Sequence, residues 1–292
     1  VCSSDLYSTG TITAISSGVN VTGSGTSWLA NASAGQHLFL GTRWYLIAAV
    51  TGNTSLVLAE AYIDDVTLPA SYRIATIKRN FSIKNLTIKN SSVTGLVITD
   101  CRQVVLDNIL LLDNNKGIVF TNCSEVTQDR ILSVSNTSNG VEATNVGLCD
   151  WESVNLIGNG GSGLVLNNVK KITLLPVASQ ANTTDGINIT TAEEIIMIPD
   201  ASGNGGQGIE LVSGNEDVTI FSGSVKNNTS DGIKLTATSD ATKIFGVDIE
   251  GNSGYGINIA ASTCDNTIIS ANHITNNTSG SISDSGTDTL IS

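Results

Sequence analysis

A glycine recurs along most of this chain at nearly constant spacing, and an apolar-x-apolar triplet follows it in most repeats. The steps are 22 to 24 residues, through Gly95, Gly117, Gly140, Gly163, Gly186, Gly208, Gly232, Gly256 and Gly280. A period of this length is typical of a solenoid. Each unit is too small to bury a core by itself, so it must stack on its neighbours.

An asparagine stands four residues before most of these glycines. The column is Asn136, Asn159, Asn182, Asn204, Asn228, Asn252 and Asn276, with Asn90 and Asn114 one place away from it in the first two repeats. Asparagine tolerates left-handed backbone angles and bonds to its own turn. Stacked amides can also bond to one another along an axis. We therefore predict a structural asparagine ladder at one corner.

Each repeat has room for three short strands. The triplet after the glycine is one, and segments such as Val104-x-Leu106 and Ile109-x-Leu111 supply the others. This pattern predicts an all-β fold, a parallel β-helix of about nine coils over residues 75–292. The column expected to face inward is Leu96, Ile118, Leu164, Ile187, Ile209, Ile233 and Ile257.

From about Arg79 to Ser292 the chain resembles the right-handed parallel β-helix superfamily, which includes pectate-lyase-like enzymes, phage tailspikes and related surface proteins. The resemblance implies the right-handed β-helix fold. It leaves the activity open, because this fold hosts lyases, hydrolases, epimerases and inert fibres. The Asp-Asp and His-Gly pattern of polygalacturonases and the arginine-rich signature of pectate lyases are both missing.

Residues 8–74 break the period and read as alternating strands joined by glycine turns. They resemble a small β domain found on the N-terminal side of phage tail and other virion proteins, which implies a connecting or attaching role. We expect its Trp28 and Trp44 to be core residues. Residues 1–7 resemble a translated sequencing adaptor, so we interpret them as a leader foreign to the fold.

The net charge of −12 argues against nucleic acid and anionic membranes as partners. It argues more weakly against a polyanionic glycan. No apolar run is long enough to span a bilayer, so membrane insertion is not expected. We expect no cofactor, apart from the calcium ion considered below.

Two cysteines, Cys101 and Cys123, take the same place in successive repeats, and Val146, Val169 and Ala192 continue that column. The pair could form a disulfide or remain buried thiols. No Cys or His cluster has zinc spacing.

One column is expected to point outward from the middle strand. Counting eleven residues back from each glycine, with a one-residue offset at Asp107, gives Lys84, Asp107, Asp129, Glu152, Leu175, Met197, Phe221 and Phe245. Asp150 adds a carboxylate from the neighbouring outward column, and Arg130 lies beside Asp129. The face is therefore acidic in its first half and apolar in its second.

Stacked carboxylates about 4.8 Å apart repel one another, so one pKa should rise, as in acid/base pairs. The catalytic candidates are Asp107, Asp129, Asp150 and Glu152, and the substrate-binding candidates are Asp129, Arg130 and Glu152. Alternatively, Asp107, Asp129 and Glu152 could hold Ca²⁺. A third interpretation is a solvated acidic face neutralised by Arg130 and Lys84.

The apolar half of the column should not stay in water. We expect Leu175, Met197, Phe221 and Phe245 to contact other copies in a homotrimer of the tailspike type. A loop of the same chain or the N-terminal domain could cover them instead.

The sequence thus predicts a tailspike- or tail-fibre-like protein at the virion surface or outside the cell. Its β-helix would recognise a cell-surface polysaccharide. The alternatives are a polysaccharide lyase or glycoside hydrolase of the same fold, and a structural extracellular fibre or adhesin.

Overall fold

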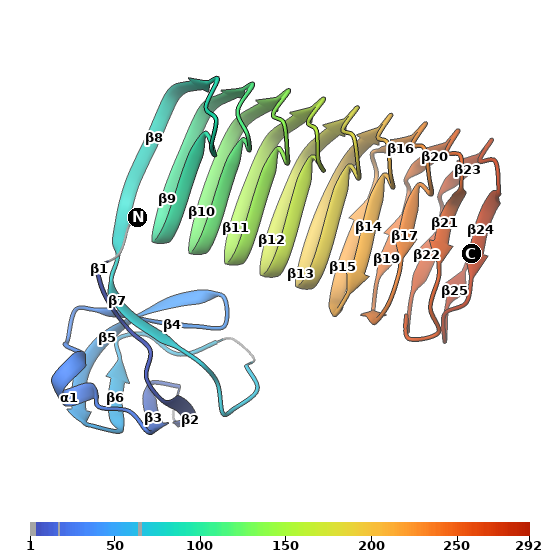
Figure 1. The fold of residues 1–292 in the computed structure, drawn as a ribbon. Coiled ribbons are helices and arrows are strands. Elements are labelled where there is room, and N and C mark those ends of the chain that lie inside the picture. The colour runs from blue at the N-terminus through green and yellow to red at the C-terminus, as the bar shows by residue number, and fades with distance from the viewer. Residues whose placement is uncertain (1–3, 17, 64–65) are drawn as a thin grey trace.

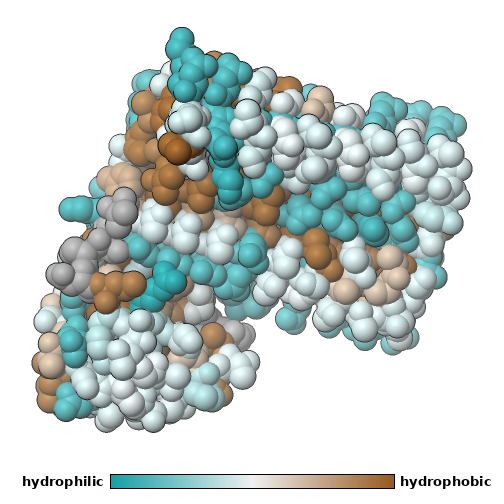
Figure 2. Space-filling model, in the orientation of Figure 1, coloured by the Kyte–Doolittle hydropathy of each residue, from teal (hydrophilic) through white to brown (hydrophobic). Residues whose placement is uncertain are grey.

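The computed structural model describes residues 4–16, 18–63 and 66–292. These residues form an all-β molecule with a small antiparallel sheet followed by a long parallel β-helix (Figure 1). In Figure 2, hydrophobic residues gather where β8 and β9 lie in Figure 1, and a band of hydrophilic residues crosses the coils farther along the helix, beside smaller hydrophobic patches.

The N-terminal sheet has seven strands within the described residues, in the spatial order β1-β7-β4-β5-β6-β3-β2. Its elements are β1 (Ser4–Tyr7), β2 (Thr11–Ser16), β3 (Asn20–Ser24), the one-turn helix α1 (Trp28–Asn31), β4 (His37–Leu40), β5 (Arg43–Gly52), β6 (Ser55–Leu58) and β7 (Arg73–Thr76). All neighbouring strands are antiparallel, as predicted.

The sheet is larger than the predicted domain at both ends. Strand β1 lies in the segment that we interpreted as a leader, and it pairs with β7. Strand β7 continues two residues past position 74. Residues 1–3 of the expected leader lie outside the described residues.

Both tryptophans of this domain are fully buried, as predicted. The indole N–H of Trp28 donates to the Tyr72 hydroxyl at 2.8 Å, so the ring is buried without an unpaired polar atom.

The β-helix begins with long bent strands that run through more than one face of a coil. They are β8 (Lys78–Lys89), β9 (Leu96–Leu112), β10 (Ile118–Val134), β11 (Val141–Ile157), β12 (Leu164–Gln180) and β13 (Ile187–Ser202). Later coils are divided into shorter strands: β14 (Ile209–Ser213), β15 (Asn215–Phe221), β16 (Ser224–Lys226), β17 (Ile233–Leu235), β18 (Ser239–Asp240), β19 (Lys243–Phe245), β20 (Asp248–Glu250), β21 (Tyr255–Ile259), β22 (Ile268–Ser270), β23 (His273–Thr275), β24 (Gly280–Asp284) and β25 (Leu290–Ile291).

All pairings between coils are parallel, and residues 78–292 make about nine turns. In β11, the first, second and third segments of the coil are residues 141–144, 149–152 and 154–157. Left-handed residues separate them: Asn145, Leu148 and Ser153 have φ of 55°, 56° and 51°. These corners turn the strand direction while the inter-coil hydrogen bonds continue.

The predicted inward column is confirmed. Ile118 pairs with Leu96 and Val141, and the same register continues to Ile257. From Ile118 onward its side chains are fully buried, whereas Leu96, near the first coil, is half-buried.

The column containing both cysteines is also confirmed, since Cys101 pairs with Cys123 and Cys123 with Val146. Cys123 is a free thiol, so it forms no bridge with Cys101. Burial raises the pKa of the Cys123 thiol to about 12, so it acts as a small core residue.

The asparagine ladder forms, with one correction. Each ladder amide donates to the side-chain oxygen of the next, and the members in continuous register are Asn136, Asn159, Asn182, Asn204, Asn228, Asn252 and Asn277. Asn276 is not a member. It lies at a left-handed corner, with φ of 56°, and bonds to Glu250 instead. Gly280 lies opposite Tyr255 and not opposite Gly256, so counting four residues back from Gly280 gives the residue before the ladder asparagine.

Asn90, at φ of 58°, occupies the same left-handed corner as Asn276, whereas Asn114 accepts from the Ser91 N–H and belongs to the ladder register. No helix in the described part of the chain has the length and hydrophobicity to cross a membrane.

Candidate functional site

The second segments of successive coils stack into one face with two outward columns. The column nearer the preceding corner contains Ser82, Val105, Thr127, Asp150, Thr173, Ile196 and Thr219, each paired with the next. Two residues farther along each strand, the other column contains Lys84, Asp107, Asp129 and Glu152. Residues two apart on a strand point to the same side, so both columns share one surface.

A column of corner residues runs beside the first outward column. Its members all have left-handed φ between 51° and 58°: Asn80, Gln103, Glu125, Leu148, Lys171, Glu194 and Asp217. A non-glycine residue adopts this conformation at some steric cost, which stacking and inter-coil bonds must offset. The repeated corner places one side chain per coil at the edge of the strand face.

These two columns line two hollows that follow one another along the helix. The larger, of about 570 Å³, lies over β11–β15 and is lined by Asp150, Lys171, Thr173, Glu194, Ile196, Asp217 and Thr219, with Leu148 and Cys149. The other, of about 450 Å³, lies over β8–β10 and is lined by Asn80, Phe81, Ser82, Gln103, Val105, Glu125 and Thr127. We call the two hollows together the axial groove.

The axial groove combines hydroxyl groups with charges of both signs. Lys171 pairs with Glu194 at 3.4 Å, and Lys243 with Asp217 at 3.0 Å. Glu125 accepts from Arg102 at 2.9 Å and from Arg43, in the N-terminal domain, at 3.3 Å. Such a surface offers donors and acceptors once per coil, which suits a ligand rich in hydroxyl groups.

The structure places the predicted acidic residues together beside this groove. Asp107 pairs with Asp129, and Asp129 with Glu152, in successive coils, while Asp150 lies within the groove itself. Arg130 donates to Asp107 at 2.6 Å and lies 3.6 Å from Asp129. The predicted neighbours therefore meet on one face.

The rise in pKa expected for one of the stacked carboxylates does not occur at Asp107. The hydrogen bond from Arg130 holds the pKa of Asp107 below its ordinary value, and the charges of Arg130 and Lys84 act in the same direction. Lys84 lies 3.7 Å from this carboxylate. Asp107 is thus ionised and paired with Arg130 and Lys84, as in the interpretation of an acidic face neutralised by these two residues.

A metal ion needs several donors that converge. Within residues 4–16, 18–63 and 66–292, no three His, Cys, Asp or Glu side chains are arranged to hold one. His37 is buried in the N-terminal sheet, whereas His273 lies on the third-segment face and contacts Asp248. Met197 faces the interior. Calcium at Asp107, Asp129 and Glu152 stays a proposal.

The predicted apolar column is wrong at Met197. Met197 pairs with Leu174 and Ile220 and is fully buried, so it faces the core. Leu175 and Pro176 together lie opposite the single residue Ile198, so this coil is one residue short. The outward residues, which we call the apolar stripe, are Leu175, Ile198, Phe221 and Phe245.

Two members of the apolar stripe form an aromatic pair. The rings of Phe221 and Phe245 stack at 5.7 Å between centroids, and Phe245 is 41% exposed. The stripe is therefore partly accessible, as a contact surface would need to be.

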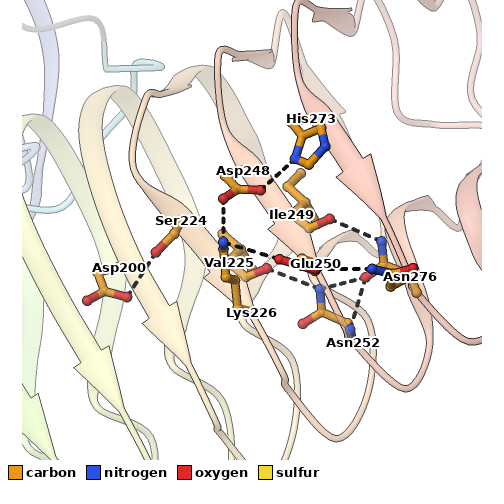
Figure 3. A network of polar contacts seen from close by, with 11 residues as sticks. Asp200, Ser224, Val225, Lys226, Asp248, Ile249, Glu250, Asn252, His273 and Asn276 are labelled. Atoms are coloured by element: carbon orange, nitrogen blue, oxygen red, sulfur yellow. Dashed lines mark hydrogen bonds and ion pairs between the residues drawn. The ribbon is translucent and has the colours of Figure 1, made fainter.

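The third segments carry a separate polar network in the later coils (Figure 3). Lys226 contacts Asp248 and Glu250, Asp248 also contacts His273, and Asp200 accepts from Ser224 at 3.1 Å. These groups bond mainly to one another, and they lie on a different face from the axial groove.

The sequence interpretation missed the corner half of the groove, including Lys171, Glu194 and Asp217. A signal was present. The residue eight or nine places after each repeat glycine is polar in most coils, as at Gln103 and Glu125. A polar residue at a fixed place just before an alternating strand marks such a corner.

Comparison with known proteins gives one family and several related folds. The sequence model of a family described as "Periplasmic copper-binding protein (NosD)" matches residues 124–292, which is more than half of the chain. No curated protein matches the chain.

Among solved structures, the Azotobacter vinelandii mannuronan C-5 epimerase AlgE6 A-module is similar, with a TM-score of 0.57 and 19% identity over 74% of this chain and 65% of that one. The AlgE4 A-module of the same organism has a TM-score of 0.50 and 20% identity, over 73% of this chain and 58% of that one. The tailspike gp61 of Pseudomonas phage phi297 has a TM-score of 0.36 and 10% identity, over 94% of this chain and 62% of that one. This chain thus spans less than two thirds of each of these structures, and the two epimerase modules share its fold.

Proposed function

The chain belongs to the NosD family, and from this premise we propose that its β-helix is an extracytoplasmic polysaccharide-binding surface that holds an extended glycan in the axial groove. The observation that carries the proposal is the groove itself. Its hollows follow the same two columns over successive coils from β8 to β15. Equivalent side chains recur about every 4.8 Å along it. A long, shallow and open surface of this kind suits a linear polymer better than a compact ligand.

The charge of the groove restricts the kind of glycan. Asp150, Glu194 and Asp217 line the larger hollow with one lysine, Lys171, and Asp129 and Glu152 lie in the adjacent column. This excess of carboxylates repels a polyanion, so a neutral or amino-bearing polysaccharide is the preferred ligand. The net charge of −12 acts in the same direction.

Copper does not enter this proposal, although the family description names it. Protein copper sites use converging imidazole, thiolate or thioether groups. In the described part of this chain, Met197 and the thiols of Cys123, Cys149 and Cys264 are buried, and no three candidate ligands converge. The donor set does not fit the metal, and we derive no step from it.

Catalysis is the alternative, carried by the in-register pair Asp129 and Glu152. Two carboxylates in adjacent coils could serve a lyase or a hydrolase as acid and base. A virion-surface location and a purely structural or adhesive role are further proposals.

Assembly is a separate proposal. The apolar stripe would contact a second copy of the chain, in a homotrimer, because Phe221 and Phe245 present stacked rings at a partly exposed face.

The binding proposal is tested by calorimetric titration with oligosaccharides of dextran, chitosan and alginate. Thr173→Trp places a large ring in the axial groove, whereas Ala178→Trp places the same ring on the third segment of the same strand. We expect at least tenfold weaker binding for Thr173→Trp and unchanged binding for Ala178→Trp. Equal affinity in the two variants, or no binding of any polymer by the wild type, would contradict the proposal.

The same titrated samples separate a binder from an enzyme. If the polymers are shortened or gain unsaturated ends, and Asp129→Asn or Glu152→Gln stops this while binding persists, the catalytic alternative is correct. Intact polymers after prolonged incubation support the binding function.

A further inference from the structure

The N-terminal domain packs directly on the β-helix, at the corner between the first and second segments of β9–β11. The indole N–H of Trp44 donates to the Asn122 carbonyl at 2.7 Å, and the ring is fully buried. Thr42 lies so close to Gly147 that an added Cβ would be 2.5 Å from its hydroxyl oxygen. Both contacts join strand β5 or the turn before it to the β-helix.

Four charged residues form a network across this junction. Arg102 of the β-helix contacts Glu60 of the N-terminal domain through both terminal nitrogens, one at 3.0 Å, and donates to Glu125 at 2.9 Å. Arg43 of the N-terminal domain lies 3.3 Å from Glu125 and 3.7 Å from Glu60. We call these four residues the junction network.

Burial makes the junction network sensitive to the loss of any member. Arg102 is only 8% exposed, so its charge requires partners. Burial raises the pKa of Glu60, but hydrogen bonding and charge from Arg102 outweigh it and hold that pKa below its ordinary value. Hydrogen bonds and charge from Glu60 and Glu125 raise the pKa of Arg102 in turn, so Glu60 and Arg102 are both charged at neutral pH.

Glu125 is a member of both the junction network and the lining of the axial groove. It is part of the junction network, and it also lines the hollow of the axial groove over β8–β10. Its backbone is left-handed, with φ of 56°, and its carboxylate is held by Arg102 and Arg43. The position of a groove carboxylate thus depends on an arginine of the other domain.

We propose that Glu125 couples docking of the N-terminal domain to ligand binding in the axial groove, so that the domain regulates the groove and is not only an attachment unit. The inference rests on the proposed glycan-binding function. A docked domain presents Glu125 to the ligand in one orientation. By reciprocity, a bound ligand must stabilise the docked domain by the same factor.

The test uses Arg43→Met in the full chain, because Arg43 contacts Glu125 but does not line the groove. Glu60→Gln is a second variant that preserves side-chain shape. The matched control is Lys116→Met, which removes the Lys116–Glu142 pair on the first-segment face. Affinity for dextran, chitosan and alginate oligosaccharides is measured by calorimetry, and docking by hydrogen exchange of β4 and β5.

We expect faster exchange in β4 and β5 and about five- to tenfold weaker binding for Arg43→Met and Glu60→Gln, with no change for Lys116→Met. Saturating oligosaccharide should slow the wild-type exchange in the same strands. Faster exchange with unchanged affinity would overturn the coupling while leaving the binding function intact. Unchanged exchange in both variants would overturn the role of the junction network. A wild type that binds none of the polymers would overturn the binding function and this inference together.

Discussion

The side-chain amide of Asn182 donates to the side-chain oxygen of Asn204 at 3.0 Å, and the backbone N–H of Asn182 donates to the same oxygen at 3.0 Å. The amide of Asn182 also donates to the Leu156 carbonyl at 3.2 Å. One buried side chain therefore satisfies polar groups in three successive coils, which is why the corner repeats.

Asn182→Ala should lower the free energy of unfolding by about 1–3 kcal/mol, because it leaves buried partners without hydrogen bonds. The matched control is Thr183→Ala, which alters an exposed neighbour at the same corner. Chemical denaturation of both variants checks the difference. Equal stabilities would show that the ladder bonds contribute nothing.

Met197→Ala should lower stability by about 2–5 kcal/mol, because it opens a cavity in the core. Phe245→Ala, at a position that is 41% exposed, should cost the folded monomer much less. Thermal unfolding of the two variants distinguishes an inward methionine from an outward one. A larger loss for Phe245→Ala would mean that the register described for this coil is wrong.

His37 gives the N-terminal domain a dependence on pH. Burial, then the charges of Arg79 and Arg102, lower its pKa from the ordinary 6.5 to about 4, and within the described chain neither ring nitrogen has a hydrogen-bond partner. The unfolded chain therefore binds more protons between pH 6.5 and 4. The contribution of neutral His37 to the free energy of unfolding is therefore fully present above pH 6.5, and it is lost as the pH drops toward 4.

The wild type should lose free energy of unfolding between pH 6.5 and 4, and we expect His37→Gln to make that loss about 1–3 kcal/mol smaller. Stability of wild type and variant is compared at pH 7, 5 and 4, with the exposed His273→Gln as control. Parallel pH profiles for wild type and His37→Gln would refute the assignment.

Replacing Phe221 and Phe245 with Ser should dissociate an assembly built on the apolar stripe and leave the coils folded, because neither ring fills the core. Burying a large apolar side chain contributes roughly 1.5–3 kcal/mol. Light scattering gives the mass of both proteins, and circular dichroism checks the fold. A monomeric wild type would rule out this contact.

The sequence predicts the coils well because the repeat glycine and the inward column are local and periodic. It fails where a coil loses or gains one residue. At Met197 a coil that is one residue short moves the count from an outward to an inward position. At Asn276 the last coil is one residue longer, because Gly280 lies opposite Tyr255 and not opposite Gly256, and the count moves from the ladder to the corner. Parallel pairing tolerates such changes, but a fixed count does not.

The acidic residues could be placed from sequence, because Asp129 and Glu152 share one column. The groove could not. Its second wall depends on left-handed angles at Lys171 and Glu194, which alternation does not encode. The junction network was also beyond sequence reasoning, because Arg43 and Glu125 belong to units whose docking no periodicity describes.

The central claim is that a glycan lies along the axial groove, and a crystal structure with a bound oligosaccharide tests it most directly. The crystals would be soaked in turn with dextran, chitosan and alginate oligosaccharides. We predict sugar rings over Thr173, Ile196 and Thr219, parallel to the helix axis and bordered by Lys171 and Glu194. Sugar bound on the third-segment face, or an empty groove at saturating oligosaccharide, would contradict the account.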